Sequence, residues 1–298
     1  MNPLPPKRQQ MTGQGAILIS AFLMSTNGLF IKIIPWHPMV ITGLRGAVAA
    51  LLLLIVRLII PPKKNVKNPP FPLWAGAISY SSAIVMFITA NKLTTAANVI
   101  LLQYSAPIWA ALLAWLFVRE KPHWELWGAL ILVLGGLTFF FRDALGQGAF
   151  LGNTLAIVSG IVFGAQSVFM RMMKDGNPRD SMLLTHILCA AAGLPFVFLY
   201  PPSITVSSVA SILYMGIFQI GLASLLFAYG IKFIPALLAM LTQVVEPILN
   251  PVWVLAITGE KPSPAVLPGG AIIITAVLAS SFIGMRREDQ KRKSETPQ

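Results

Sequence analysis

The sequence predicts an all-α integral membrane protein whose ten transmembrane helices form two inverted five-helix repeats. Three observations support this prediction: a composition with few charges, a series of long apolar segments, and an internal repeat. Of the 298 residues, 56% are hydrophobic and 11% are charged, and the mean hydropathy is +0.74. A soluble domain carries about 25% charged residues. A chain with so few charges could not cover the surface of a water-soluble globule.

The elements follow one another closely along the chain. Residues 1–13 are polar and are predicted to form a cytoplasmic tail. Each apolar segment that follows is long enough for one crossing, because about 20 residues span the hydrocarbon core as a helix. The segments cover residues 14–34, 38–60, 72–91, 95–118, 124–141, 149–173, 180–200, 207–231, 235–258 and 265–285. Asp180 is predicted to cap the start of the seventh helix.

The basic residues predict the orientation. Seventeen of the 22 Lys and Arg residues fall in segments on one side of the membrane, four fall on the other, and Arg45 lies within a helix. Lys and Arg collect on the cytoplasmic side, so we expect both termini, including the basic tail 286–298, to be cytoplasmic in an inner (plasma) membrane. The same pattern accounts for the net charge of +12 without any binding of nucleic acid.

The chain repeats itself at an offset of 140 residues. Over residues 92–122, nine positions are identical to their counterparts in the second copy, without a gap. The identities include Gln103 with Gln243, Pro107 with Pro247, and Glu120-Lys121-Pro122 with Glu260-Lys261-Pro262. Because five crossings is an odd number, the second copy, residues 149–285, enters the membrane from the side opposite to the first, residues 14–141. Secondary transporters have this architecture, with the substrate site near the midplane between the halves.

Several stretches of the chain resemble the EamA-type repeat of the drug/metabolite transporter superfamily. They are residues 91–98, 103–107 and 116–122, a helix with Gly128, Gly135 and Gly136, the helix start Arg45-Gly46-Ala47, Val245-Glu246-Pro247, and Gly259-Glu260-Lys261-Pro262. The resemblance covers nearly the whole chain as two tandem repeats. It implies ten helices with both ends inside and the export or exchange of small metabolites. It does not fix the substrate, because the family spans amino acids, amines, sugars and drug-like cations.

Ionisable groups at membrane depth are costly and are therefore functional hypotheses by default. Glu246 is the one acidic residue of ten that lies well inside a predicted helix, and Pro247 and Pro251 open that helix by removing backbone donors. We expect Glu246 to face a central cavity and to bind a proton, a cationic group of the substrate, or each in turn. The alternative is a structural carboxylate paired with Arg45, with His186 or with a helix end.

The two basic candidates each leave two interpretations open. Arg45, near the start of the second helix, either contacts a substrate carboxylate or an outer gate, or extends outward as an interface anchor. His186, about two turns into the seventh helix, is either a proton relay or a hydrogen-bonded packing residue. Lys32 and Lys92, at the outer ends of their helices, are expected to be solvated.

Uncharged polar and aromatic side chains at mid-membrane levels complete the candidate site. They are Asn27, Tyr80, Gln103, Tyr104, Gln243 and Trp253. The repeat-related glutamines are predicted on opposite sides of one cavity, with the aromatic rings as apolar or cation–π walls. Polar groups also hold helices together, and Trp collects at membrane interfaces, so packing and anchoring are the alternatives. The Gly160-x-x-x-Gly164 motif favours helix packing within one chain over dimerisation, so a monomer and a homodimer both stay open.

The sequence has no phosphate-binding Gly-rich loop with Lys-Ser/Thr, no His-Glu-x-x-His and no Gly-x-Ser-x-Gly. We therefore expect neither a cofactor, nor a metal, nor catalysis. The predicted function is a secondary active transporter, with export favoured, of a small metabolite such as an amino acid, amine or drug-like compound. Its partners would be that substrate, membrane lipid and a proton as the coupling ion, with substrate exchange as the other driving force. A lipid or lysolipid flippase and a non-transporting membrane scaffold are the alternatives.

Overall fold

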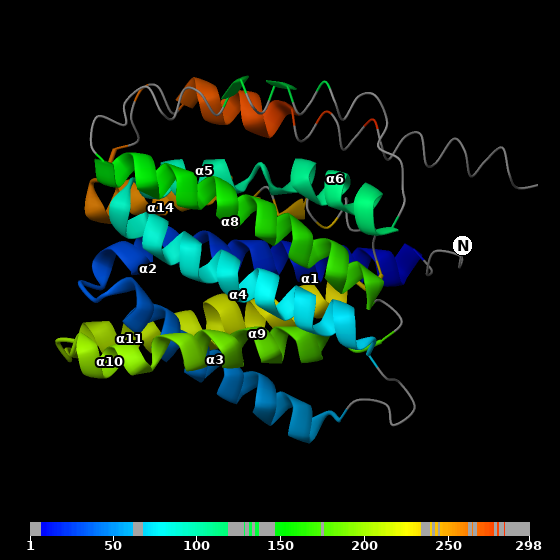
Figure 1. Cartoon of the computed structure of the whole chain (residues 1–298), viewed down its shortest axis with the longest axis horizontal. Coiled ribbons are helices and arrows are strands. Elements are labelled where there is room, and N and C mark those ends of the chain that lie inside the picture. Colours follow the sequence, from blue (N-terminus) through cyan, green and yellow to red (C-terminus); the bar gives the residue numbers. More distant parts are fainter. Residues whose placement is uncertain are drawn as a thin grey trace, which may run out of the picture.

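The computed structural model describes residues 7–61, 68–118, 128, 131–132, 135–136, 147–173, 176–233, 239, 242–243, 245–261, 264, 267–276, 279 and 283. The named elements are α1 (Lys7–Ser25), α2 (Asn27–Ile33), α3 (Pro38–Ile59), α4 (Pro70–Leu93), α5 (Ala96–Gln103), α6 (Ala106–Val118), α8 (Gln147–Met172), α9 (Pro178–Gly193), α10 (Pro195–Leu199), α11 (Val206–Tyr214), the π-helix η1 (Met215–Leu222), α12 (Ala223–Gly230) and α14 (Val245–Thr258). They run along the long axis of an elongated bundle (Figure 1).

Long apolar helices fill the described part of the chain. Seven are long and apolar enough to cross a membrane: Met11–Ile33, Pro38–Ile59, Pro70–Leu93, Ala96–Phe117, Ala149–Met172, Pro178–Leu199 and Val206–Gly230. Val245–Thr258 and Leu267–Ala276 are shorter apolar helices that fall within the predicted ninth and tenth crossings. The predicted fifth crossing, 124–141, lies almost entirely outside the described residues. The all-α membrane architecture is confirmed.

The bounds of the helices repeat at the offset seen in the sequence. Adding 140 residues to α3, Pro38–Ile59, gives the span Pro178–Leu199 of α9 and α10. The same shift carries α6, Ala106–Val118, onto α14, Val245–Thr258, to within one residue at its start. In the first pair, proline occupies the first helical position of both members, where its missing N–H has no intrahelical partner to lose.

The two halves run in opposite directions. His37, which precedes α3, stacks on Tyr200, which follows α10, with ring centroids 4.2 Å apart. At the other end of α3, Arg57 is ion-paired with Asp180 in the first turn of α9. Helix α3 is therefore antiparallel to the helices that the repeat makes its counterpart, as an inverted repeat requires.

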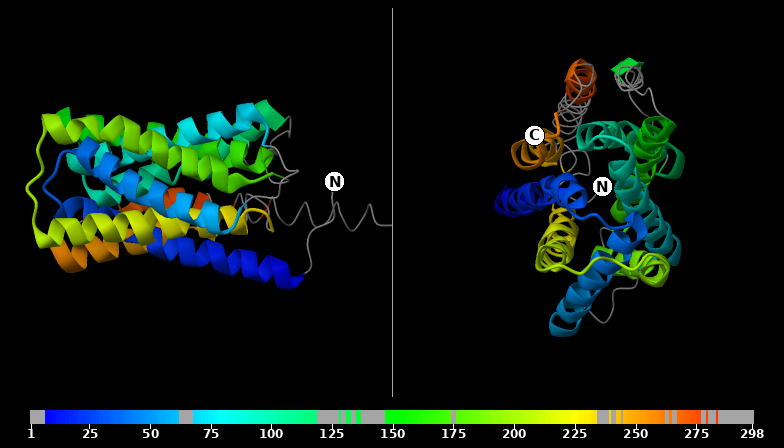
Figure 2. Two further views of the ribbon diagram at one scale, coloured as in Figure 1. Left: turned by 90° about the horizontal axis from the view of Figure 1, so that it is seen from below. Right: turned by 90° about the vertical axis from the view of Figure 1, so that its left-hand side faces the viewer.

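Helices of the two halves interlock rather than forming separate bundles. α4 packs against α8, and its repeat-related pairing is α12 against α1. In the same way, the packing of α6 against α8 corresponds to the packing of α14 against α1. The pair α3 and α9 is its own counterpart, because the repeat exchanges its two members. Seen nearly end-on, the helices of both halves are intermixed around the bundle (Figure 2). The apolar core is accordingly shared, with buried side chains from both halves in one cluster.

The start of α9 differs from the prediction. Its N-cap is Asn177, and Pro178 takes the first helical position, so Asp180 lies in the first turn instead of capping the helix. The carboxylate of Asp180 accepts hydrogen bonds from Arg57, Asn68 and Asn177. The predicted cap was wrong because proline fixes the start of the helix upstream of the acidic residue.

The GxxxG motif of α8 packs within the chain. A Cβ atom on Gly160 would lie 2.8 Å from the carbonyl oxygen of Gln103, and one on Gly164 would lie 2.7 Å from that of Ala106. Glycine therefore allows α8 to approach the α5–α6 break more closely than any other residue would, and the expectation of intrachain packing is confirmed.

We predict that Gly160→Ala destabilises the protein, because its methyl group must displace the backbone of α5. Overpacking of this kind costs about 1–3 kcal/mol. Gly15→Ala is the matched control, since a Cβ atom there meets nothing within 4 Å. Thermal unfolding of the two purified variants in the same detergent measures the difference. Equal melting temperatures would contradict the close approach.

Candidate functional site

Two transmembrane helices are broken at repeat-related positions. α5 ends at Gln103 and α6 begins at Ala106, and Gln243 forms a turn just before α14. Pro107 and Pro247 explain both breaks, because proline lacks the N–H that would bond the carbonyl four residues earlier. The carbonyls deprived in this way are those of Gln103 and Gln243. Within hydrocarbon, each must find another partner inside the protein.

Tyr104 joins the two breaks. Its hydroxyl donates a hydrogen bond to the carbonyl of Gln243, so the interrupted helix of one half is tied to that of the other. A pocket with about 190 Å³ of empty space lies here, lined by Tyr104, Ala106, Pro107, Phe163 and Gln243. The repeat-related glutamines were predicted on opposite sides of one cavity, but only Gln243 lines this pocket, and Tyr104 rather than Gln103 faces it from the first half.

Glu246 follows this break, in the first turn of α14, and is 3% exposed. It lies within electrostatic range of the hydroxyl groups of Tyr80 and Tyr104. The ion pairs among the described residues are Lys32–Glu260 and Arg57–Asp180, so Glu246 has no basic side chain of the described chain within 4.0 Å. The alternative to a functional role was a structural carboxylate paired with Arg45, with His186 or with a helix end. Of these three, only the helix end is supported, because a negative charge is favoured in the first turn of a helix.

Arg45 is buried inside the protein, with 1% of its surface exposed. The interface-anchor alternative is therefore wrong. Its Nη1 donates to Oδ1 of Asn27 at 2.8 Å and to Oε1 of Gln219 at 3.5 Å, and Nε2 of Gln219 donates to Oγ1 of Thr26 at 2.9 Å. We call these four residues the arginine cluster. Its acceptors are neutral, and Nε of Arg45 has no hydrogen-bond partner in the described chain.

Irregular backbone presents the arginine cluster. The first crossing is interrupted at Thr26, between α1 and α2, which places Asn27 at a helix start. Gln219 lies in the π-helix η1, a widened turn of the kind that is often found at functional sites. Gly216 of η1 packs against α3 so closely that a Cβ atom there would lie 3.1 Å from the carbonyl of Arg45. The cluster thus joins three crossings from both halves.

His186 and Tyr80 connect the two charges. Nε2 of His186 is 3.0 Å from the hydroxyl of Ser224, and its Nδ1 has no partner in the described chain. The ring of Tyr80 lies 6.4 Å from that of His186 and stacks on Phe163 of the pocket at 5.8 Å. Tyr80 also lies within electrostatic range of both Arg45 and Glu246. One aromatic side chain therefore stands between the arginine cluster and the pocket.

Two predicted site residues are not brought into this arrangement. Gln103 donates from Nε2 to Ser159 on α8 at 2.7 Å. The indole of Trp253 donates to Ser25 at 3.0 Å and meets Phe22 edge-on. Both contacts hold neighbouring helices together, which was the alternative for Gln103; for Trp253 the alternative was a place in the membrane-interface belt.

Asn250 also belongs with the site, and the sequence already places it among the polar residues at mid-membrane level in the second half. It lies one turn after Glu246 on the same face of α14, is fully buried, and neither atom of its amide has a partner in the described chain. A Cβ atom on Gly28 would lie 2.5 Å from its Oδ1, so this face of α14 meets α2 beside Asn27. The i, i+4 spacing from Glu246 was the signal available in the sequence.

A second contact between the halves lies at the end of the bundle where α2, α4 and α14 end. Nζ of Lys32 is 2.9 Å from Oε2 of Glu260 and donates to the carbonyl of Thr94 at 2.8 Å. Oε1 of Glu260 accepts from the N–H of Ala96, the first residue of α5. We call this set the terminal clasp. Lys32 and Lys92 were expected to be solvated, but the first is ion-paired and the second donates to the carbonyl of Ile34.

A helical membrane protein with interlocked, inverted halves and helices broken beside buried charges has the architecture of a secondary transporter. The chain belongs to the EamA-like transporter family, whose model matches residues 11–142 and 150–282. The two matched segments correspond to the two copies of the repeat.

Similar proteins include transporters from bacteria and archaea. The chain is 26% identical over 273 residues to "Uncharacterized transporter YwfM" of Bacillus subtilis (strain 168), covering 89% of this chain and 92% of that protein. It is 26% identical over 270 residues to an "Uncharacterized transporter" of Archaeoglobus fulgidus, covering 89% and 95%. A solved crystal structure matches 94% of this chain and 99% of its own, with a TM-score of 0.66 and 20% identity, which establishes a shared fold.

We predict that Tyr104→Phe loosens the junction of the two halves. The substitution keeps the ring and removes the hydroxyl, so the Gln243 carbonyl keeps only its bond to the N–H of Glu246, and the loss costs about 0.5–1.5 kcal/mol. Tyr229→Phe is the control, because Tyr229 is 47% exposed and lies away from the breaks. Thermal unfolding of both variants checks this. Equal melting temperatures would show that the junction does not depend on the hydroxyl.

Proposed function

We propose that the chain is a secondary active transporter that exports a small metabolite by alternating access, with both termini in the cytoplasm. The observation that supports it best is the pair of buried opposite charges, Arg45 and Glu246. Neither has an oppositely charged partner within 4.0 Å in the described chain. A charged group at membrane depth costs about 2.5–3.5 kcal/mol even on the lowest scale. Because the two buried charges do not pair with each other, each is available to bind a charged group of a ligand.

Glu246 is the proposed coupling group. An ionised carboxylate in this position binds either a proton or a cationic group of the substrate, and the two compete for the same oxygens. Protonation from outside neutralises Glu246 and releases the bound cation, and loss of the proton to the cytoplasm restores the carboxylate for the next substrate. One carboxylate with alternating occupants therefore couples proton entry to substrate exit.

Arg45 is the proposed partner for an anionic group of the substrate. Asn27 and Gln219 hold its guanidinium by Nη1, and Nε has no partner in the described chain. Between the substrate classes that the sequence left open, this favours an amino acid over a simple amine. An amino acid supplies a carboxylate for Arg45 and an ammonium group for Glu246, whereas an amine would leave the guanidinium unpaired.

The terminal clasp is the proposed outer gate. It links α2, the start of α5 and the end of α14, which belong to both halves. Gly259, with φ of 74°, ends α14 in the left-handed region and turns the chain toward Glu260. Lys32 and Glu260 retain only 22% and 25% exposure of their side chains. The clasp must separate before substrate can leave at this end.

We predict that Glu246→Gln abolishes accumulation driven by a pH gradient, because the amide keeps the shape of the side chain and cannot take up a proton. The measurement is flux of amino acids, amines and drug-like compounds in proteoliposomes that contain the full chain. Glu288→Gln, in the polar C-terminal segment, is the control and retains wild-type flux. Because the variant loses a buried charge, its melting temperature is not lowered.

Two results would overturn the proposal. Unchanged pH-driven flux in Glu246→Gln would remove the coupling role. Absence of flux for every solute, combined with lipid scrambling by the wild-type protein in the same vesicles, would replace the transporter of soluble metabolites with a lipid flippase.

We predict that the terminal clasp tolerates exchange of its charges better than loss of one. Lys32→Glu and Glu260→Lys each place like charges together, so each single variant slows transport. The double variant restores the ion pair and recovers part of the rate, although it lacks the carboxylate that caps α5. Arg8→Glu, an exposed charge on α1, serves as the control for a charge reversal. A double variant slower than both singles would contradict an ion-pair gate.

A further inference from the structure

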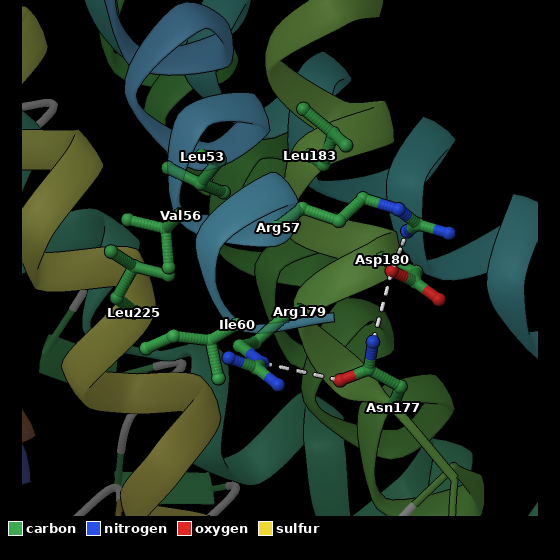
Figure 3. A pocket seen from close by; sticks show the side chains of 9 residues that line it. All are labelled: Leu53, Val56, Arg57, Ile60, Asn177, Arg179, Asp180, Leu183 and Leu225. Carbon is green, nitrogen blue, oxygen red and sulfur yellow. Dashed lines mark hydrogen bonds and ion pairs between the residues drawn. The ribbon is translucent and has the colours of Figure 1, made fainter. Parts of the chain in front are cut away.

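A second pocket opens at the other end of the bundle, where α3 ends and α9 begins, with about 260 Å³ of space that includes the solvent at its mouth. Its polar edge is formed by Arg57, Arg179 and Asp180, and Leu53, Leu183 and Leu225 form apolar walls (Figure 3). These residues come from α3, α9 and α12, so both halves contribute. No residue of the central site described above lines this pocket.

The charges at the edge of the pocket do not cancel. The Asp180 carboxylate is paired with Arg57 and accepts from Nδ2 of Asn68 at 3.1 Å and from Nδ2 of Asn177 at 3.0 Å. Arg179 donates only from Nε, to Oδ1 of Asn177 at 3.3 Å. Within the described chain, its two terminal nitrogens have no partner, so the positive charge of Arg179 is left to bind an anion.

The pocket adjoins the lipid-facing surface of the bundle. Leu58 and Ile59, in the last turn of α3, are 74% and 73% exposed, as side chains in contact with acyl chains are. In Figure 1 this end of α3 stands away from the neighbouring helices. The sequence also predicts this end, with its excess of Lys and Arg, to be on the cytoplasmic side, where anionic lipids concentrate.

We propose that this pocket binds an anionic phospholipid, with the phosphate at the guanidinium of Arg179 and the glycerol and first methylenes against the leucine walls. The apolar walls favour a lipid over free phosphate, which has no apolar part to bury. The bound lipid bridges α3, α9 and α12 and so stabilises the packing of the two halves. The proposal does not depend on which solute the protein transports.

The test uses the delipidated full chain in detergent, titrated with phosphatidylglycerol or with phosphatidylcholine. Bound lipids are counted by native mass spectrometry, and melting temperatures are recorded in parallel. We expect phosphatidylglycerol to bind and raise the melting temperature, and phosphatidylcholine to do neither. Arg179→Gln weakens phosphatidylglycerol binding about fivefold, the factor for one basic residue at an anionic membrane surface. Arg171→Gln, on α8 outside the pocket, leaves it unchanged.

Asp180→Asn is expected to change binding in the opposite direction. Its amide leaves the charge of Arg57 without compensation, so phosphatidylglycerol binds more tightly, which a purely structural role of Asp180 would not produce. If this variant does not fold, the comparison of Arg179→Gln with Arg171→Gln still tests whether Arg179 binds the phospholipid. Equal binding by wild type and Arg179→Gln, equal affinity for the two lipids, or displacement of phosphatidylglycerol by millimolar inorganic phosphate would each overturn the proposal.

Discussion

A backbone carbonyl inside hydrocarbon needs a hydrogen-bond donor from the protein, and Pro247 removes the donor that the Gln243 carbonyl would have in a regular helix. Two groups take its place: the N–H of Glu246 at 2.9 Å and the hydroxyl of Tyr104 from the other half. Because these two donors replace the missing N–H, one helix segment ends here and α14 begins, with Glu246 in its first turn. The break, the junction of the halves and the position of the buried carboxylate all follow from it.

The two buried charges, Arg45 and Glu246, are kept apart from each other. Arg45 is held by Asn27 and Gln219, which are neutral, and Glu246 lies within electrostatic range of Tyr80 and Tyr104, which are neutral as well. If the two charges formed an ion pair, both would be satisfied and neither would need a ligand. Hydrogen bonds to neutral groups lower the cost of burial without cancelling the charge. This separation is the basis of the proposal that the substrate carries charged groups itself.

Much of the fold is predictable from the sequence because long apolar segments and proline act locally. The described helices fall at the expected places, and Pro107 and Pro247 mark the two breaks. The burial of Arg45 was not predictable, because the side chains that hold it, Asn27 and Gln219, belong to other helices and meet it only in the packed structure. The widened turn around Gln219 packs closely against α3, a contact between segments far apart in the sequence.

The terminal clasp could not be predicted from the sequence for a second reason. The repeat makes Glu260 conspicuous, but its partners, Lys32 and the N–H of Ala96, lie far away in the sequence. An end-of-helix lysine has the same sequence signature whether it is solvated or paired, so composition and spacing cannot distinguish the two. Only the inverted packing, which brings the ends of α2 and α14 to one end of the bundle, makes the contact.

The scaffold is symmetric, whereas its chemistry is not. At the 140-residue offset, Arg45 corresponds to Thr185, Glu246 to Ala106 and Tyr80 to Ile220. Inverted halves can exchange conformations at little cost, because each then takes the packing that the other had. A site built from both halves equally would present the same groups to either side. Arg45 and Glu246 each occur in one half only. In the proposed alternating-access mechanism, a substrate would therefore meet a single arrangement of charges whichever end is open, while the symmetric part of the fold moves around it.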